Sequence, residues 1–292
     1  MLGFFKYSRF KLRDHRGFCV PKGPDFPSSR KYTYKLQGSS LSFRAPTQIH
    51  IGRPGSEQLT SKWKVDDLKD LSPHDTETYN HTWYGRAIFQ RKYALYGPWF
   101  TGEMAEAGCN LAAVAPKKLN TDINFLHPRA FESALSGYLT ADFGYQQDDA
   151  GVADYCGPLQ WQPIKRLPVP AVRFMVKSED WSHRAILYCF PISKNRILIF
   201  NFYFDQRISG NFAEMDAAIS PKPAMELIDN IINSVEFVPS PELEKNLAEL
   251  RTSCPNLAVS DTFPPLKWPA TVDKTGLNIV ELRSKQRKAL AS

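Results

Sequence analysis

The chain has 292 residues, of which 42% are hydrophobic and 23% are charged, and this balance excludes wholesale disorder because it supplies enough apolar surface for a core. The formal net charge is +7, which favours an acidic partner: nucleic acid, an anionic membrane face or an acidic protein surface. Aromatic residues make up 13% of the chain, and a surplus of rings beyond the needs of a core is typical of recognition surfaces.

Targeting signals and cysteine usage both indicate a cytoplasmic protein. No stretch approaches the roughly 20 consecutive apolar residues of a membrane-spanning helix. The start, Met1-Leu-Gly-Phe-Phe-Lys6, lacks the apolar region of a signal peptide. The cysteines are scattered without a Cys-x-x-Cys pair, which argues against a disulfide framework or a zinc knuckle and fits a reducing compartment.

The chain opens with a basic arm and then changes to a strand pattern. Residues 1–31 are rich in cations and aromatic rings and are interrupted by prolines, so we expect an irregular N-terminal arm. From Tyr32, apolar and polar residues alternate on both sides of the turn Gly38-Ser39-Ser40. This pattern predicts a β-hairpin that ends before Pro46.

The next part, up to residue 157, is expected to be an N-terminal α+β subdomain that begins with the hairpin at residue 32. Residues 53–80 are polar with a weak helical stripe. The aromatic stretch 83–100 predicts one or two strands, and residues 111–115 predict a further short strand. Pro128 in a first turn, followed by apolar residues on one face up to Leu139, predicts a helix.

Residues 158–255 are expected to form a C-terminal part, separated by a proline-rich linker at residues 158–170. Three apolar runs between residues 171 and 204, joined by short polar connections, predict an antiparallel meander. Ser220-Pro221 and Ser240-Pro241 each predict the start of a helix, as N-cap and first-turn proline. A proline-punctuated basic tail, residues 256–292, follows.

The order of these elements resembles the PsbP-like α/β/α sandwich, which is shared with bacterial DcrB-type proteins. The resemblance rests on the hairpin Leu41-Ser-Phe43-Arg-Ala-Pro46, the meander, and the helix-then-strand ending from Met225 to Phe237. It implies an α+β fold in which an antiparallel β-sheet is flanked by helices. Residues 53–157 depart from the pattern, as an insertion or as a separate subdomain.

Function is also suggested by this resemblance, since proteins of this fold are mostly non-catalytic binders. In bacteria, relatives occur beside type VI secretion toxins as chaperones. We therefore expect a protein-binding protein: an immunity protein that binds and neutralises a cognate secreted toxin, with nucleases among the candidate toxins. An effector chaperone ranks third, because a chaperone for a toxin's transmembrane segment would be about half this length and would expose an apolar groove.

No motif for catalysis, metal binding or phosphate binding is present, so we expect no enzyme activity, no metal and no cofactor. His-Glu-x-x-His, Gly-x-Ser-x-Gly, Gly-x-Gly-x-x-Gly and the Walker A pattern are all missing. His74 and His81 lie in one polar stretch with two acidic residues, and we expect solvated loop residues there. Cys109 looks the least buried of the thiols, and an enzyme of unfamiliar type stays the third alternative.

The first candidate partner-binding stretch interleaves rings with cations. Such residues dominate protein interfaces when they are desolvated, but they equally suit nucleic acid, where rings stack on bases and cations neutralise phosphates. Nucleic-acid binding is therefore the runner-up function. Strand alternation is expected to place many rings on an inner face and the cations outside. The candidate residues are Trp83, Tyr84, Arg86, Arg91, Tyr93, Tyr96 and Trp99.

The second candidate is the acidic loop 146–154, with Asp148, Asp149 and Asp154. Its spacing does not match a calcium loop, which leaves a solvated loop or a loop that docks on a basic patch of a partner. A basic inhibitor cannot mimic nucleic acid as a whole. Against a nuclease toxin it would have to bind acidic surface beside the active site, or offer this loop.

Overall fold

The computed structural model describes residues 7–47, 83–117, 123–144, 146–178 and 183–268. Within these residues the strands form two antiparallel sheets. The smaller sheet has the order β1-β2-β9, with β1 Arg30–Leu36, β2 Ser39–Ala45 and β9 Glu236–Val238. The larger sheet has the order β3-β4-β8-β7-β6-β5, with β3 Trp83–Tyr96, β4 Glu103–Pro116, β5 Cys156–Pro163, β6 Val172–Ser178, β7 His183–Ser193 and β8 Arg196–Gln206.

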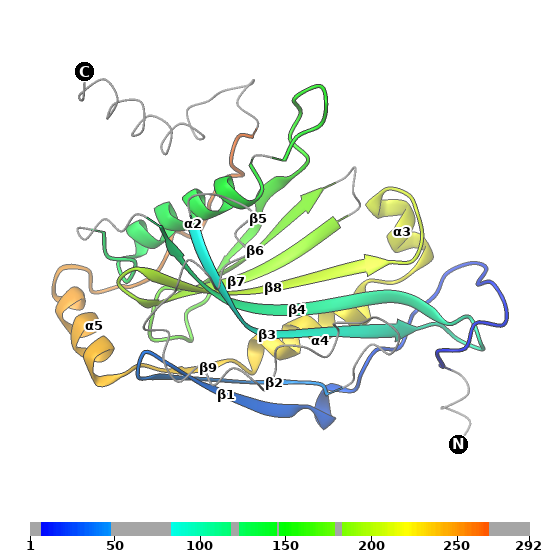
Figure 1. Ribbon diagram of the computed structural model, residues 1–292, viewed down its shortest axis with the longest axis horizontal. Helices are drawn as coiled ribbons and strands as arrows, with labels where there is room; N and C mark the ends of the chain where they lie inside the picture. The colour runs from blue at the N-terminus through cyan, green and yellow to red at the C-terminus, as the bar shows by residue number, and fades with distance from the viewer. Residues whose placement is uncertain (1–6, 48–82, 118–122, 145, 179–182, 269–292) are drawn as a thin grey trace.

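Helices cover both faces of the six-stranded sheet (Figure 1). Helix α2 (Pro128–Asp142) packs on one face, and α4 (Lys222–Asn233) lies on the other face together with the three-stranded sheet. Helix α3 (Phe212–Ala218) follows β8, and α5 (Pro241–Ser253) follows β9. The predicted α+β class, an antiparallel sheet flanked by helices, is confirmed.

The core has two parts because strand residues alternate between the two sheet faces. On β8, Phe200 and Phe202 point between the two sheets, whereas Ile197 and Ile199 pack against α2. The part between the sheets is the larger one and includes the apolar stripe of α4. Strand β7 is buried along nearly its whole length, as its continuous apolar run predicted.

Several elements begin where local signals predicted them. The hairpin β1–β2 turns at Gly38, whose φ of 80° lies in the left-handed region. Residues 172–206 form the predicted meander β6-β7-β8. Helix α5 begins at Pro241, with Ser240 Oγ accepting a hydrogen bond from the Leu243 amide at 3.2 Å. Helix α4 begins one residue later than predicted, with Pro221 as its N-cap.

Other elements differ from the prediction. The segment 158–170 is not a free linker, since β5 occupies its first half and pairs with β6. Strands from both sides of this segment share one sheet, because β4 pairs with β8. Strand β4 is also far longer than the predicted 111–115. Its first half could not be predicted from the sequence because alanine and glycine have weak β-propensity.

Residues 53–80, with their predicted helical stripe and the pair His74 and His81, lie outside the described residues. Across the described ranges, no helix combines the length and apolar character needed to cross a membrane.

Candidate functional site

One end of the α2-side sheet face is polar. On β8, Ile197 and Ile199 pack against α2, whereas the next side chains on that face are those of Asn201, Tyr203 and Asp205. The neighbouring strands show the same change, and their polar-end residues are Asn110, Gly108 and Glu106 on β4 and His183 on β7. We call this region the polar end of the sheet.

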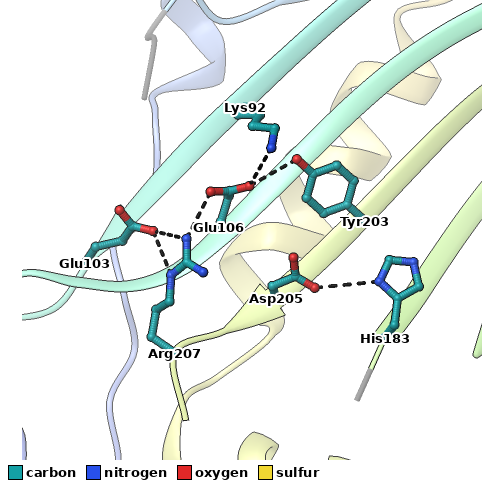
Figure 2. A network of polar contacts seen from close by, with 7 residues as sticks. All are labelled: Lys92, Glu103, Glu106, His183, Tyr203, Asp205 and Arg207. Atoms are coloured by element: carbon teal, nitrogen blue, oxygen red, sulfur yellow. Dashed lines mark hydrogen bonds and ion pairs between the residues drawn. The ribbon is translucent and has the colours of Figure 1, made fainter. Parts of the chain in front are cut away.

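Glu106 is the centre of a charged network at the polar end (Figure 2). Its side chain is only 2% exposed, yet it is an ion-pair partner of Lys92 Nζ at 3.6 Å and of Arg207 at 3.0 Å. It also accepts a hydrogen bond from the Tyr203 hydroxyl at 3.1 Å. Arg207 donates in addition to Glu103, at 2.6 and 2.9 Å. Because its partners surround it, the buried carboxylate is neutralised and held in place.

Tyr203 lies flat across a glycine on the neighbouring strand. A Cβ atom built on Gly108 would sit 1.9 Å from Tyr203 Cε1, so only glycine leaves room for the ring. Lys92 Nζ lies 5.8 Å from the centre of the same ring. The glycine thus fixes the position from which the tyrosine hydroxyl reaches Glu106.

The accessible groups of the polar end are His183 and Asp205. Their Nδ1 and Oδ1 atoms are 3.8 Å apart, and both side chains are partly exposed. The His183 ring lies between those of Tyr155 and Tyr203, with centroid distances of 6.2 and 6.4 Å. These groups can hydrogen-bond a partner. Within the described ranges, no group of three or more His, Cys, Asp or Glu is arranged to hold a metal ion.

A second candidate surface forms where the N-terminal arm runs beside the tip of the β3–β4 hairpin. The Leu12 amide donates to the Phe100 carbonyl at 2.8 Å, and Arg13 Nε donates to the Trp99 carbonyl at 2.7 Å. We define the arm–hairpin surface as residues 7–22 of the arm, residues 97–102 of the hairpin, and Arg207 and Ile208, which directly follow β8.

Exposed apolar side chains are concentrated on the arm–hairpin surface. Among the described residues, eight large hydrophobic side chains are exposed, and six of them lie here, at 43–78% exposure. These six are Phe10, Leu12, Phe18, Val20, Trp99 and Ile208. Exposed cations alternate with them along the arm: Arg9, Lys11, Arg13, Arg16 and Lys22. Apolar and cationic groups in this mixture are typical of an interaction surface.

A cavity of about 620 Å³ opens within this surface, between the arm, the hairpin and α3. Its apolar lining includes Phe18, Met104 and Ile208, and its polar lining includes Glu103 and Arg207. The cavity therefore adjoins the Glu106 network, since Arg207 belongs to both. Its volume is within the range that accommodates a small ligand or a large side chain of a partner.

Three of the predicted partner-binding residues are buried. Trp83 belongs to the core beneath α2, whereas Tyr93, 1% exposed, and Arg91, 8% exposed, lie between the two sheets. The prediction that the cations of this stretch face outward is wrong for Arg91. It shares the inner face with Phe89 and Tyr93 because it lies two residues from each of them, so the alternation of the strand places all three on the same side.

The remaining residues of this stretch do not form one surface. Tyr84 and Arg86 are partly exposed at the beginning of β3, near Lys117, whose Nζ lies 5.3 Å from the Tyr84 ring centre. Tyr96 and Trp99 lie at the other end, in the hairpin region that the arm contacts. The structure thus places Trp99 on the arm–hairpin surface and Tyr96 beside it, but it does not place the stretch as a whole there.

The acidic loop is a tight turn. Asp148 Oδ1 accepts a hydrogen bond from the Val152 amide at 2.7 Å, so this side chain closes the loop. Asp149 is exposed and Asp154 is partly exposed. Tyr155 follows directly and contacts His183, which places the loop at the border of the polar end of the sheet.

The cysteine expected to be least buried is fully buried. Cys109 lies on β4 between β3 and β8 with its side chain in the core, and burial raises the pKa of its thiol far above the ordinary value. Cys156, at the start of β5, is the exposed thiol instead. A buried thiol with a raised pKa is a poor nucleophile.

Sequence reasoning missed both candidate surfaces. The alternation Arg9-Phe10-Lys11-Leu12-Arg13 was a usable signal, but cations near a chain terminus are more often solvated. No local signal identified the network, since Glu106 and Arg207 are 101 positions apart.

No protein-family model matches the chain, and no curated protein matches it. Among solved structures, the chain is similar to the apo structure of the immunity protein TplEi of the type VI secretion system from Pseudomonas aeruginosa. The identity is 11%, the TM-score is 0.22, and the match covers 81% of each chain. At this TM-score the similarity supports no inference about fold or function.

Proposed function

We propose that this chain is a non-catalytic protein that binds one protein partner stoichiometrically, and that the partner is a secreted toxin which the chain neutralises as an immunity protein. The observation that carries the binding role is the arm–hairpin surface. Exposed apolar side chains, exposed cations and a cavity of about 620 Å³ occur together there.

The physical reason is the cost of leaving such a surface in water. Large apolar side chains gathered on one surface favour association, and aromatic and arginine side chains at the centre of an interface supply most of its binding energy. The cavity offers a place for an anchoring side chain of the partner. The five exposed cations of the arm favour a partner with an acidic surface.

A protein fits this surface better than nucleic acid. Apolar side chains, among them Phe18, Met104 and Ile208, line the cavity and suit an apolar anchoring side chain of a protein better than a phosphate group. The runner-up function is nucleic-acid binding through residues 83–100, but Trp83 and Tyr93 of this stretch are buried in the core. A stacking platform needs such rings at the surface.

The immunity role rests on the resemblance of the element order to PsbP-like proteins, which are mostly binders, and it assumes a cytoplasmic location. Against a nuclease, this basic surface would bind acidic residues beside the active site and would not mimic the substrate. An effector chaperone and an enzyme of unfamiliar type are the lower-ranked alternatives.

Affinity capture with matched variants tests the proposal. The tagged chain is immobilised, exposed to lysate of the source organism, and the captured protein is identified by mass spectrometry. Light scattering after size exclusion then measures the stoichiometry of the complex. We expect a single 1:1 protein partner. The arm variant Phe10→Ser/Leu12→Ser/Trp99→Ser should lose this partner, because it removes apolar contact area while leaving every cation in place.

The control is Val152→Ser/Val238→Ser, which removes two exposed apolar side chains away from the arm–hairpin surface. It should retain the partner. Equal capture by the arm variant would contradict the proposed surface. If no protein partner is captured and the chain instead shifts the gel mobility of labelled RNA or DNA in a salt-sensitive way, nucleic-acid binding would be favoured. Turnover of a substrate that one polar substitution abolishes would refute both binding functions.

A further inference from the structure

A buried guanidinium lies between the two sheets without a carboxylate partner. Arg91 on β3 is 8% exposed and points toward β1, which runs beside β3 on the side opposite α2 (Figure 1). Its NH2 group donates to the Tyr32 hydroxyl at 3.4 Å, and its Nε atom is buried without any hydrogen-bond partner among the described residues. No described carboxylate forms an ion pair with it.

Three tyrosine side chains lie close to Arg91: Tyr32 accepts its hydrogen bond, and the charge of Arg91 acts on the hydroxyls of Tyr34 and Tyr93. Tyr32 and Tyr34 come from β1 and Tyr93 comes from β3, two residues after Arg91. The hydroxyls of Tyr34 and Tyr93 are buried and have no hydrogen-bond partner in the described part of the chain. Tyr32 and Tyr34 are partly exposed, so the cluster reaches the surface at β1.

These groups share one chemical property, since all of them can donate hydrogen bonds. Burial raises the pKa of Tyr34 to about 12 and that of Tyr93 well above its ordinary value, so both hydroxyls are protonated at neutral pH. An unpaired buried cation and unpaired buried hydroxyls each destabilise a protein. A single group that accepts hydrogen bonds and carries negative charge would satisfy all of them.

We propose that Arg91, Tyr34 and Tyr93, with Tyr32 at the entrance, form an oxyanion-binding site between the two sheets. The ligand class is a carboxylate or a phosphate. The guanidinium would supply charge and paired donors, and the hydroxyls would supply the remaining hydrogen bonds. The site is separate from the arm–hairpin surface and does not depend on the proposed function.

Thermal unfolding with added anions tests the site. The full chain is melted in sodium chloride, in inorganic phosphate and in acetate, at equal ionic strength and pH 7. We expect a rise in Tm of roughly 2–4 °C in at least one oxyanion relative to chloride, because a ligand that binds the folded state alone stabilises it. A rise in phosphate alone identifies a phosphate site, and a rise in acetate alone identifies a carboxylate site.

Two variants connect the effect to the cluster. Arg91→Met removes the charge and keeps an apolar stem, and Tyr93→Phe removes one hydroxyl; both should lose most of the rise. Lys35→Met, which removes an exposed cation from β1, should keep the full rise. The site would be refuted if neither oxyanion raises Tm above chloride, or if Arg91→Met and Tyr93→Phe retain the full rise.

Discussion

Tyr203 of the charged network packs directly against Gly108, and this contact depends on the missing Cβ atom of the glycine. In Gly108→Ala the new Cβ would overlap the Tyr203 ring, which must then move away and release its hydrogen bond to Glu106. We expect the free energy of unfolding to fall by about 1–3 kcal/mol, as for other overpacked sites. Urea unfolding measures it.

Gly85→Ala is the matched control, because a Cβ atom there would lie 3.6 Å from Val114 Cγ1, an ordinary contact. It should change the free energy of unfolding by less than about 1 kcal/mol. Equal losses in the two alanine variants would show that the position of Tyr203 does not depend on Gly108.

Single residues also show where sequence reasoning reached its limit. Rings such as Phe89 and Tyr93 are buried as predicted, and Arg91, two residues from each, shares their inner face. The expectation that the cations face outward failed there because it followed the charge of the side chain and not its position in the strand. Cys109 looked accessible between a glycine and an asparagine. Its burial is decided by the strands on either side, β3 and β8, and not by its neighbours in sequence.

At the scale of elements, the C-terminal end of α2 predicts a dependence of stability on pH. Asp142 is the last residue of α2, where the helix dipole disfavours negative charge. Burial raises its carboxyl pKa above the ordinary value of 3.8, although the hydrogen bond from Tyr138 at 3.2 Å opposes this shift. The folded state therefore holds the proton more tightly than the unfolded state, and stability falls as pH rises from 3.8 through the folded-state pKa.

Asp142→Asn removes this titration while keeping an acceptor for Tyr138. We expect the variant to be more stable than the wild type by about 0.5–1 kcal/mol at pH 7 and nearly equal to it at about pH 3, where the wild-type carboxyl is protonated in both states. Urea unfolding at the two pH values measures the difference. A gain of the same size at both pH values would contradict the assignment to Asp142.

Elements were predictable where their signals are local. The turn at Gly38, the N-cap Ser240 and the apolar runs of the meander each depend on neighbouring residues, and these elements were found. Strand β4 was predicted too short, and helix α3 was not predicted. Strand β4 consists largely of alanine and other weak strand formers, and it is held in the sheet by its partners β3 and β8.

At the scale of the whole molecule, the arm is attached to a sheet that does not need it for its core. Residues 7–18 are exposed or partly exposed, and the first buried residue of the arm is Cys19. We expect a chain that lacks residues 1–17 to keep its far-UV circular dichroism and to melt within about 2 °C of the full chain. A markedly lower Tm would show that the arm is a structural element and would weaken its role as a binding surface.

The candidate surfaces were less predictable than the fold because they combine distant segments. The arm–hairpin surface joins residues 7–22 to the hairpin tip and to Ile208, and its cavity exists only after these segments meet. Composition indicated a basic protein with surplus rings. Which rings are exposed was decided by the sheet topology, which buried Trp83, Phe89 and Tyr93 and left Trp99 outside.

The central claim, that the arm–hairpin surface binds one protein partner, is tested most directly by isothermal titration of the purified partner. The titration uses the wild type, Phe10→Ser/Leu12→Ser/Trp99→Ser and Val152→Ser/Val238→Ser. We predict a 1:1 stoichiometry and, for the arm variant, an increase in Kd of at least about 100-fold, since each lost hot-spot side chain costs on the order of 1–2 kcal/mol. The control variant should bind as the wild type does. An arm variant that binds as tightly as the control would contradict the account.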